Sequence, residues 1–167
     1  NTLLTFLWLA GALACLTWLL WGHLRSKRVY AASLPVSSAA VQDWQAHNPL
    51  RRPVQVRCSD RIASPLTYGV LYPVVLLPSG MDLSDAEALS YVLAHEYTHI
   101  RRFDALRKGL LALALCLHWF NPMAWVMYYL AGRDMELACD EAVIRSGANR
   151  RSYALALLRL EEERGRG

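Results

Sequence analysis

Charge is scarce in this sequence. Charged residues make up 19% of its 167 residues and apolar residues 54%, whereas a soluble globular domain carries about 25% charged residues. Residues 2–22 contain no charged residue, and the run is long enough to span a hydrocarbon core of about 30 Å. The lack of charge argues against an ordinary soluble domain and predicts a transmembrane helix at residues 2–22.

Other absences narrow the class further. The four cysteines follow no framework spacing, so we expect no disulfide bonds. The sequence has no internal repeat, no low-complexity segment and no nucleic-acid-binding motif. Its net charge of +4 is spread along the chain, with clusters beside the apolar segments. This distribution favours the lipid bilayer as a partner and argues against direct contact with nucleic acid.

The charges that follow the first apolar run indicate its orientation. Arg25, Lys27 and Arg28 come directly after it, and basic residues flank membrane spans on the cytoplasmic side. We therefore expect a protein of the cell membrane in which the chain from residue 25 onward faces the cytoplasm.

The segment after the span is the least regular part of the chain. We interpret residues 23–53 as a cytoplasmic linker with one short helix, which Ser37 or Ser38 could cap. Residues 54–167 are expected to form the main domain.

Two segments with the pattern of β-strands begin that domain. Residues 54–58 alternate between apolar and polar side chains, and residues 66–77 are rich in β-branched and aromatic residues. Gly69 and Pro73 interrupt the second run, and proline cannot donate to a central strand ladder. This run is therefore expected to form a bent hairpin or an edge strand.

Helices dominate the rest of the sequence. Ser84-Asp-Ala-Glu87 is a capping box, in which the Ser84 hydroxyl and the Glu87 carboxylate would each satisfy a free N–H at a helix start. Further helices are expected at residues 105–119, 123–146 and 151–163. The predicted fold class is mainly α with a small antiparallel β-sheet (α+β).

The helix that begins near Ser84 carries the sequence His95-Glu-Tyr-Thr-His99. Two histidines four residues apart project from one face of a helix, and this separation suits two imidazole nitrogens on one zinc ion. Glu96 is then in position to act as general base on a water molecule at the metal. A helix that carries two histidines by chance is the competing interpretation.

A third ligand strengthens the zinc interpretation. Glu136 and Asp140 lie four residues apart on a later predicted helix. One can bind the metal while the other accepts a hydrogen bond from a ligand histidine. A solvated acidic patch is the alternative for this pair. Cys139 is a rival third ligand, ranked below Glu136 because three-ligand hydrolytic sites more often use a carboxylate.

The apolar stretch between the two motifs tests this idea. If the chain crossed the membrane once there, Glu136 would lie about 30 Å from His95. Asn121-Pro122 offers a return, because proline ends a helix. Helices over 104–120 and 122–136 would measure about 24 and 21 Å. We therefore predict an apolar helical hairpin over residues 105–132 that brings Glu136 back beside the histidines.

Several segments together resemble a known family. HEYTHIRRFD, the turn WFNP, ELACDEAV and the upstream SPLTYGVLYPVVLLPSG match the pattern of the BlaR/MecR-type membrane metallopeptidases, a branch of the gluzincins. SYALALLRL also resembles the family's helix after the third ligand. The resemblance covers residues 50–163, and a preceding membrane span also fits.

The resemblance implies a zinc ion held by His95, His99 and Glu136, with Glu96 as general base and Asp140 as a partner of the ligands. Asp104 also matches a family position, although its helix phase predicts that it points away from the zinc.

The resemblance also implies a substrate-binding edge strand, on which gluzincins lay an extended peptide. Its residues here are Tyr68, Gly69, Val70 and Leu71. Family receptors carry further membrane helices and often a penicillin-binding sensor with a Ser-x-x-Lys motif. This chain begins with Asn and has neither, so we expect these parts to be missing from a fragment.

The sequence thus predicts a membrane-bound, zinc-dependent endopeptidase. Its substrate would be a protein, either a transcriptional repressor or the enzyme's own chain, in a signalling pathway such as an antibiotic response. The alternative is a non-catalytic signalling scaffold with a structural zinc site, against which the intact Glu96 argues. No residue can be assigned from the sequence to stabilise the oxyanion.

Overall fold

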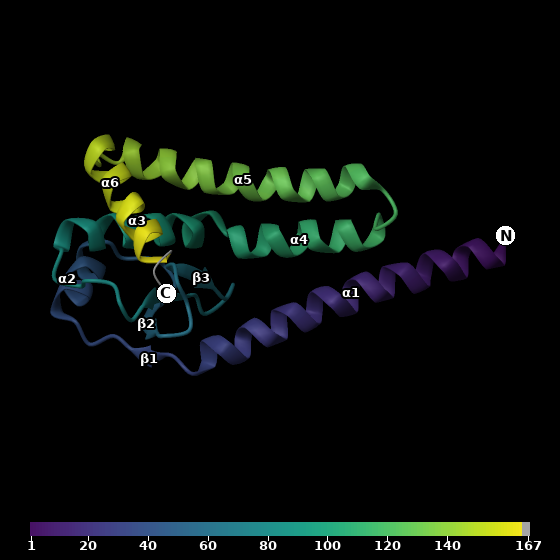
Figure 1. Cartoon of the computed structure of the whole chain (residues 1–167), viewed down its shortest axis with the longest axis horizontal. Helices are drawn as coiled ribbons and strands as arrows, with labels where there is room; N and C mark the ends of the chain where they lie inside the picture. The colour runs from purple at the N-terminus through teal and green to yellow at the C-terminus, as the bar shows by residue number, and fades with distance from the viewer. Residues whose placement is uncertain (165–167) are drawn as a thin grey trace.

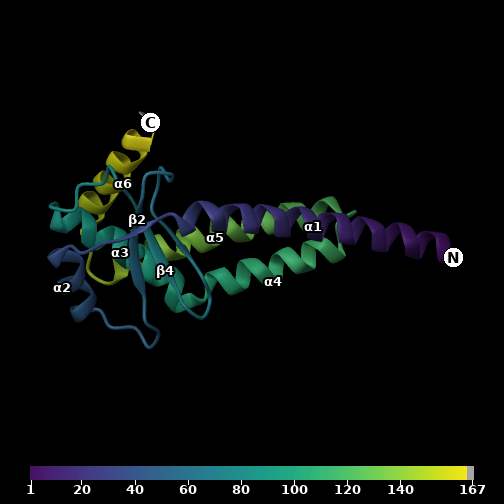
Figure 2. The same ribbon diagram turned by 90° about the horizontal axis from the view of Figure 1, so that it is seen from below.

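The computed structural model describes residues 1–164, apart from the side chains of residues 29, 31 and 159–164. A small sheet lies under a layer of helices, and long helices extend away from it to one side (Figures 1 and 2). In chain order the elements are α1 Thr2–Ala31, β1 Leu34–Pro35, α2 Ala39–His47, β2 Gln55–Ser59, β3 Leu66–Tyr68, β4 Val74–Pro78, α3 Ala86–Arg102, α4 Asp104–Leu117, α5 Pro122–Arg145 and α6 Arg150–Arg164.

The sheet has four strands in the order β1-β2-β4-β3. β3 and β4 form the predicted antiparallel hairpin, with β3 at the edge. The prediction of a wholly antiparallel sheet is wrong, because β2 and β4 pair in parallel, with Val56 opposite Val75. The reason is that the connection through β3 returns the chain to the same end of the sheet. β1, from the predicted linker, adds an antiparallel edge beside β2.

The core forms between the sheet and one face of α3. Val75 and Leu77 of β4 are fully buried and cluster with Leu89 and Leu93 of α3. α2 is the short helix predicted within residues 23–53, and it covers this cluster with Val41. Burial of this apolar face fixes the rotation of α3 about its axis and therefore the direction in which its other face points.

The start of α3 differs from the predicted capping box. Asp85 is the cap, and its carboxylate accepts a hydrogen bond from the Ala88 N–H at 3.0 Å. The Ser84 hydroxyl instead donates to Asp82 at 2.6 Å, and Glu87 accepts from the Tyr91 hydroxyl at 2.8 Å. Asp82, Ser84 and Asp85 all lie near the helix start, and the bond from Ser84 to Asp82 leaves Asp85 as the cap.

The predicted helical hairpin is present as α4 and α5, which lie side by side (Figures 1 and 2). Asn121 caps α5 by accepting from the Met123 N–H at 2.9 Å, and Pro122 is the first helical residue, where its missing N–H costs nothing. After α5, Gly147 takes the positive φ of 104° expected at a helix stop. Asn149 accepts from the Arg151 N–H as the predicted cap of α6.

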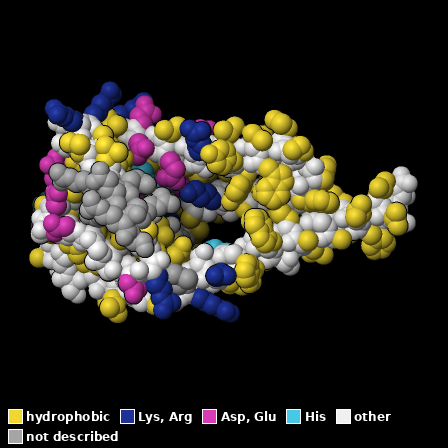
Figure 3. All heavy atoms as spheres, in the orientation of Figure 1, with side chains coloured by type: hydrophobic (Ala, Val, Ile, Leu, Met, Phe, Trp, Pro, Cys, Tyr) yellow, Lys and Arg dark blue, Asp and Glu magenta, His cyan; other side chains and the backbone are white. Residues whose placement is uncertain are grey.

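The first helix is longer than the predicted residues 2–22. Its stretch Thr2–Arg28 is long and apolar enough to cross a membrane. Figure 3 shows hydrophobic side chains over α1 and the hairpin, whereas acidic side chains gather at the other end of the molecule.

Two tryptophans join α1 to the end of the hairpin. The Trp8 indole donates to the Leu117 carbonyl at 3.0 Å, and the Trp119 indole donates to the Trp8 carbonyl at 3.2 Å. Gly11 makes this approach possible, because a Cβ atom there would lie 2.1 Å from the Trp119 ring. The side chains of Cys15 on α1 and Cys116 on α4 interact across the same interface. These contacts hold α1 against the hairpin.

Gly11→Leu should therefore separate α1 from the hairpin, since its side chain would overlap the Trp119 ring. We expect a several-fold lower yield of the Cys15–Cys116 cross-link formed under mild oxidation and quantified by mass spectrometry. Gly22→Leu is the matched control, because a Cβ at Gly22 meets nothing within 4 Å. Equal yields in the two variants would show that α1 does not pack as described.

Candidate metal site

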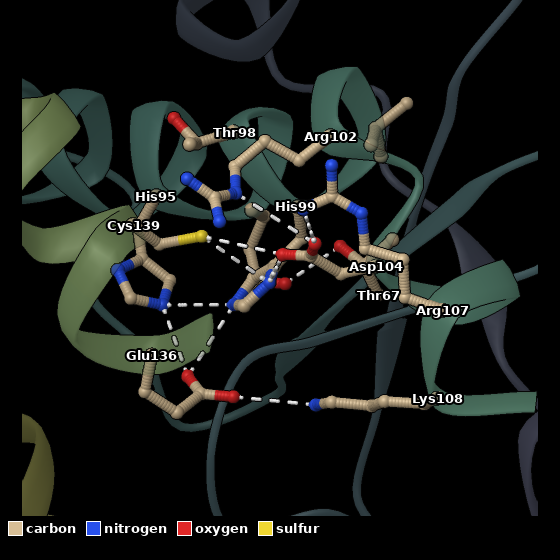
Figure 4. A network of polar contacts seen from close by, with 12 residues as sticks. Thr67, His95, Thr98, His99, Arg102, Asp104, Arg107, Lys108, Glu136 and Cys139 are labelled. Atoms are coloured by element: carbon tan, nitrogen blue, oxygen red, sulfur yellow. Dashed lines mark hydrogen bonds and ion pairs between the residues drawn. The ribbon is translucent and has the colours of Figure 1, made fainter. Parts of the chain in front are cut away.

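Two imidazoles and one carboxylate converge between α3 and α5. His95 and His99 lie one turn apart on α3, with their Nε2 atoms 3.2 Å from each other. Glu136 Oε2 of α5 lies 3.5 Å from His95 Nε2 and 3.3 Å from His99 Nε2. Figure 4 shows Glu136 opposite both rings. The structure thus brings together the three residues that the sequence indicates as ligands.

These distances match the ligand shell of one zinc ion. Zinc binds imidazole nitrogen and carboxylate oxygen at about 2.0–2.2 Å in tetrahedral geometry, which separates neighbouring ligand atoms by roughly 3.3–3.6 Å. The three donor atoms here are 3.2, 3.3 and 3.5 Å apart. One ion can therefore contact all three with little rearrangement. A fourth, open position would remain for water or substrate.

Carboxylates behind the two rings determine which nitrogens can bind metal. Asp104 Oδ2 lies 2.9 Å from His99 Nδ1, and Asp140 Oδ1 lies 3.1 Å from His95 Nδ1. An ionised carboxylate only accepts hydrogen bonds, so each Nδ1 carries the proton and each Nε2 presents its lone pair. With both imidazoles neutral, two lone pairs and the Glu136 carboxylate facing one another at these distances would repel. A cation between them removes the repulsion, so this donor set fits a metal ion.

The pKa values of the candidate ligands agree with this assignment. Burial lowers the pKa of His99, but hydrogen bonds with Cys139, Glu136 and Asp104 outweigh it and raise that pKa to about 11. His95 and His99 in turn hold the pKa of the Glu136 carboxyl well below its usual range. The raised pKa of His99 and the lowered pKa of Glu136 both mean that positive charge is favoured between these residues.

Asp104 corrects the prediction that it points away from the zinc face. The helix does not continue through Phe103, which takes a left-handed conformation with φ 57° and ψ 38°. This residue ends α3 and starts α4 in a new direction, so the helical phase counted from His99 does not apply. Asp104 turns back under His99 with its side chain only 2% exposed.

Cys139, the rival third ligand, lies on the wrong side of His99 for this metal position. Its Sγ is 3.3 Å from His99 Nδ1 and 3.6 Å from Asp104 Oδ2, whereas the Glu136 carboxylate faces Nε2. His99, Asp104 and Cys139 form a second group with metal-binding atoms. However, the His99–Asp104 hydrogen bond already satisfies that nitrogen. The thiol therefore supports Asp104 rather than the converging Nε2 atoms.

Glu96 lies beside the converging ligands and is only 5% exposed. Burial raises the pKa of its carboxyl, and a hydrogen bond from Thr67 partly opposes this effect. The Thr67 hydroxyl of β3 donates to Glu96 Oε2 at 2.6 Å. No sequence pattern selects Thr67, since its contact with Glu96 depends on how the edge strand lies on α3.

A cleft passes the site on both sides. One cavity of about 160 Å³ extends between β3 and the start of α4, and another of about 300 Å³ extends toward α6. Pro65, Glu96 and Glu136 line both cavities. The two cavities therefore meet where the candidate ligands converge, which suits a chain-like molecule that passes across the site.

The predicted substrate strand overlaps this cleft only in part. β3 ends at Tyr68, whose ring stacks on Tyr30 with centroids 5.1 Å apart. Gly69 and Val70 line the first cavity, whereas Leu71 is 75% exposed and lines neither cavity. Leu66 and Thr67, one step earlier in the chain, also line it. The strand beside the site therefore begins two residues before the predicted one.

Arg52 holds this edge in position. Its guanidinium donates to the Val70 and Ile100 carbonyls and lies 4.0 Å from the centroid of the Phe103 ring. It therefore joins the loop after β3 to the end of α3 and to the left-handed residue. Nothing in the local sequence marks Arg52 for this role.

Tyr153 of α6 completes the surroundings of His95. Its hydroxyl donates to Asp140 Oδ1 at 2.7 Å and lies 3.0 Å from His95 Nδ1. Burial and the bond to Asp140 raise the pKa of this hydroxyl, so it stays protonated. The family resemblance includes the whole segment SYALALLRL and does not single out any residue in it. Only the packing of α6 on α3 distinguishes Tyr153.

Comparison with known proteins agrees with these motifs. A family model described as BlaR1 peptidase M56 matches residues 1–166. The chain belongs to this family. The resemblance predicted from the sequence is therefore confirmed at the level of the family, which is described as a peptidase family.

Curated relatives are similar over parts of their length. The regulatory protein BlaR1 of Bacillus licheniformis is 38% identical over 88 residues, which cover 53% of this chain and 15% of the relative. The methicillin resistance mecR1 protein of Staphylococcus aureus is 21% identical over 154 residues, 86% of this chain and 25% of the relative. The chain thus spans a quarter or less of the length of these proteins.

Tyr153→Phe should weaken zinc binding, because it removes the hydroxyl that orients Asp140 and His95. Loss of such an outer partner lowers metal affinity by about 10-fold or somewhat more. Competition against a chromophoric zinc chelator measures this affinity. Tyr91→Phe is the control, since it removes a phenol that donates to Glu87 at the surface. The same affinity in both variants would exclude this role for Tyr153.

Proposed function

We propose that this chain is the catalytic core of a membrane-bound zinc endopeptidase. His95, His99 and Glu136 would hold the metal, and Glu96 would be the general base. The observation that carries the proposal is the convergence of His95 Nε2, His99 Nε2 and Glu136 Oε2 within a 3.5 Å triangle, next to a buried glutamate in an open cleft.

The reaction would be hydrolysis of a peptide bond. When bound, zinc lowers the pKa of a water molecule to about 7 and polarises a carbonyl group. Glu96 accepts a proton from the attacking water as the water oxygen bonds to the carbonyl carbon, and the carbonyl π electrons move onto its oxygen. When that electron pair returns, the C–N bond breaks and Glu96 gives its proton to the leaving amine. Thr67 holds one oxygen of Glu96 and so fixes the direction of the other.

The edge position of β3 supports a protein substrate. β4 covers only one side of this strand, so an extended peptide could pair with the other side and pass over the site. The substrate would be a transcriptional repressor or the enzyme's own chain. The relatives named regulatory protein BlaR1 and methicillin resistance mecR1 protein favour a signalling role in an antibiotic response.

The distribution of side chains supports a membrane location with the site toward the cytoplasm. Arg25, Lys27 and Arg28 follow the apolar part of α1, as expected on the cytoplasmic side. The far end of the hairpin exposes Phe120 and Met123. The arms of the hairpin would accordingly enter the bilayer from the cytoplasmic face without crossing it.

Glu96→Gln should abolish most cleavage while zinc binding persists. Removal of a general base costs roughly 10²–10⁴-fold in rate, and glutamine keeps the size of the side chain. We would compare cleavage of fluorescently labelled casein by the detergent-solubilised, zinc-loaded proteins and measure about one zinc ion per chain in both. Glu87→Gln is the matched control, because it removes an exposed carboxylate from the same helix.

The outcome separates the enzyme from the alternative. Zinc in both proteins with equal cleavage, or with none, would favour a signalling scaffold with a structural metal.

The same cleavage assay in sealed membrane vesicles tests the orientation of the site. Inverted vesicles should cleave added casein, and right-side-out vesicles should not. The reverse pattern would contradict a cytoplasmic site.

A further inference from the structure

The proposed reaction leaves one requirement open. Negative charge develops on the former carbonyl oxygen, and enzymes stabilise such an oxyanion with a preorganised donor. Apart from the histidines His95 and His99, four of the described residues that line the two cavities carry donor side chains: Arg52, Ser64, Thr67 and Lys108.

Two of these donors already have partners. Arg52 donates to the Val70 and Ile100 carbonyls, and Thr67 donates to Glu96. A change in either contact would disturb the edge strand or the general base. Lys108 also contacts one carboxylate, but its ammonium group has three N–H donors, so Lys108 and Ser64 remain as candidates for the oxyanion.

Lys108 lies at the mouth of the site. Its Nζ is 3.3 Å from Glu136 Oε1, while the other oxygen of that carboxylate faces the two imidazoles. Figure 4 shows the lysine reaching the oxygen of Glu136 that does not contact the histidines. The ammonium group is thus separated from the converging ligand atoms by the width of one carboxylate. It keeps two further N–H donors for a substrate.

The backbone fixes this arrangement. Asp104 and Lys108 are four residues apart on α4, so they share one face of the helix. The contact between Asp104 and His99 anchors the first turn of that face under the site. The lysine stem then reaches the cleft from the next turn, and its side chain is 47% exposed, which leaves it room to follow a substrate.

We propose that Lys108 is the catalytic residue that stabilises the oxyanion during peptide hydrolysis. This inference rests on the proposed function. Lys108 would give a hydrogen bond and a charge to the oxygen but would transfer no proton. The negative charge that it stabilises arises when the carbonyl electrons move onto oxygen and disappears when the C–N bond breaks.

Ser64 is the weaker candidate. It carries no charge and lines the cavity on the side of His95 and Asp140. An ionised donor forms the stronger hydrogen bond to an anion. The cavity that Lys108 lines borders β3, along which the substrate backbone would lie.

The test compares Lys108→Met with Arg133→Met in the detergent-solubilised, zinc-loaded chain. Arg133 is an exposed cation of α5, three residues from Glu136, and lines neither cavity. The substrate is a quenched-fluorescence peptide selected from a combinatorial library for cleavage by the wild type. Loss of an oxyanion donor should lower kcat about 10²-fold in Lys108→Met. KM and zinc content should stay close to wild type, and Lys108→Arg should recover part of kcat.

Calorimetry supplies a readout that does not depend on turnover. A phosphinic peptide with the same sequence imitates the tetrahedral oxyanion. Lys108→Met should lose affinity for it by about the factor lost in kcat. Arg133→Met and Ser64→Ala should bind it as the wild type does.

Three results would overturn the inference. Lys108→Met could equal Arg133→Met in kcat and in phosphinic peptide affinity. It could also lose zinc and recover full kcat at saturating zinc, in which case the lysine only pairs with Glu136. Loss of phosphinic peptide affinity in Ser64→Ala alone would assign the role to Ser64. Equal cleavage by wild type and Glu96→Gln would instead contradict the proposed function itself.

Discussion

The hydrogen bond between His99 Nδ1 and Asp104 Oδ2 joins the two halves of the site. It orients one imidazole so that its Nε2 lone pair faces Glu136. It also fixes the first residue of α4 against α3, and α4 leads into the hairpin that returns the chain to Glu136. The same short contact thus determines the tautomer of a ligand and the direction of the chain that supplies the next ligand.

A carboxylate buried as deeply as that of Asp104 costs several kcal/mol unless it is well paired. Here His99 and the Cys139 thiol approach one oxygen. Arg102 and Arg107 lie 3.7 and 3.5 Å from the other. These contacts place donors and positive charge around the Asp104 carboxyl, which offsets part of the cost of its burial.

The left-handed conformation of Phe103 costs free energy, and the direction of α4 depends on it. Such a conformation is unfavourable by about 1–2 kcal/mol for a residue with a Cβ atom. The Arg52 guanidinium stacked on its ring contributes a stabilisation of similar size, about 0.5–2 kcal/mol. Arg52 also holds the loop after β3, so the corner between α3 and α4 and the edge of the cleft depend on one side chain.

Periodicity and chain-breaking residues predicted the frame of the site but not its surroundings. His95, His99 and Glu136 could be grouped because helical spacing and the Asn121-Pro122 turn determine where they meet. Asp104 could not be assigned correctly, since a left-handed phenylalanine has no signature in the sequence. Thr67 and Tyr153 act through contacts between distant segments.

The sheet shows the same limit of local patterns. The alternation of residues 54–58 predicted a strand, and β2 is there. Whether that strand pairs in parallel or antiparallel depends on the path of the connection, which no short pattern encodes. The cap of α3 moved from Ser84 to Asp85 for a comparable reason, since several neighbouring residues could fill the position.

The central claim is that two histidines and one glutamate bind a single zinc ion. X-ray absorption at the zinc edge of the metal-loaded chain tests it most directly. The structure predicts about four nitrogen or oxygen neighbours at about 2.0–2.1 Å, with the multiple scattering typical of two imidazoles. A sulfur neighbour at about 2.3 Å would identify Cys139 as a ligand and contradict the account.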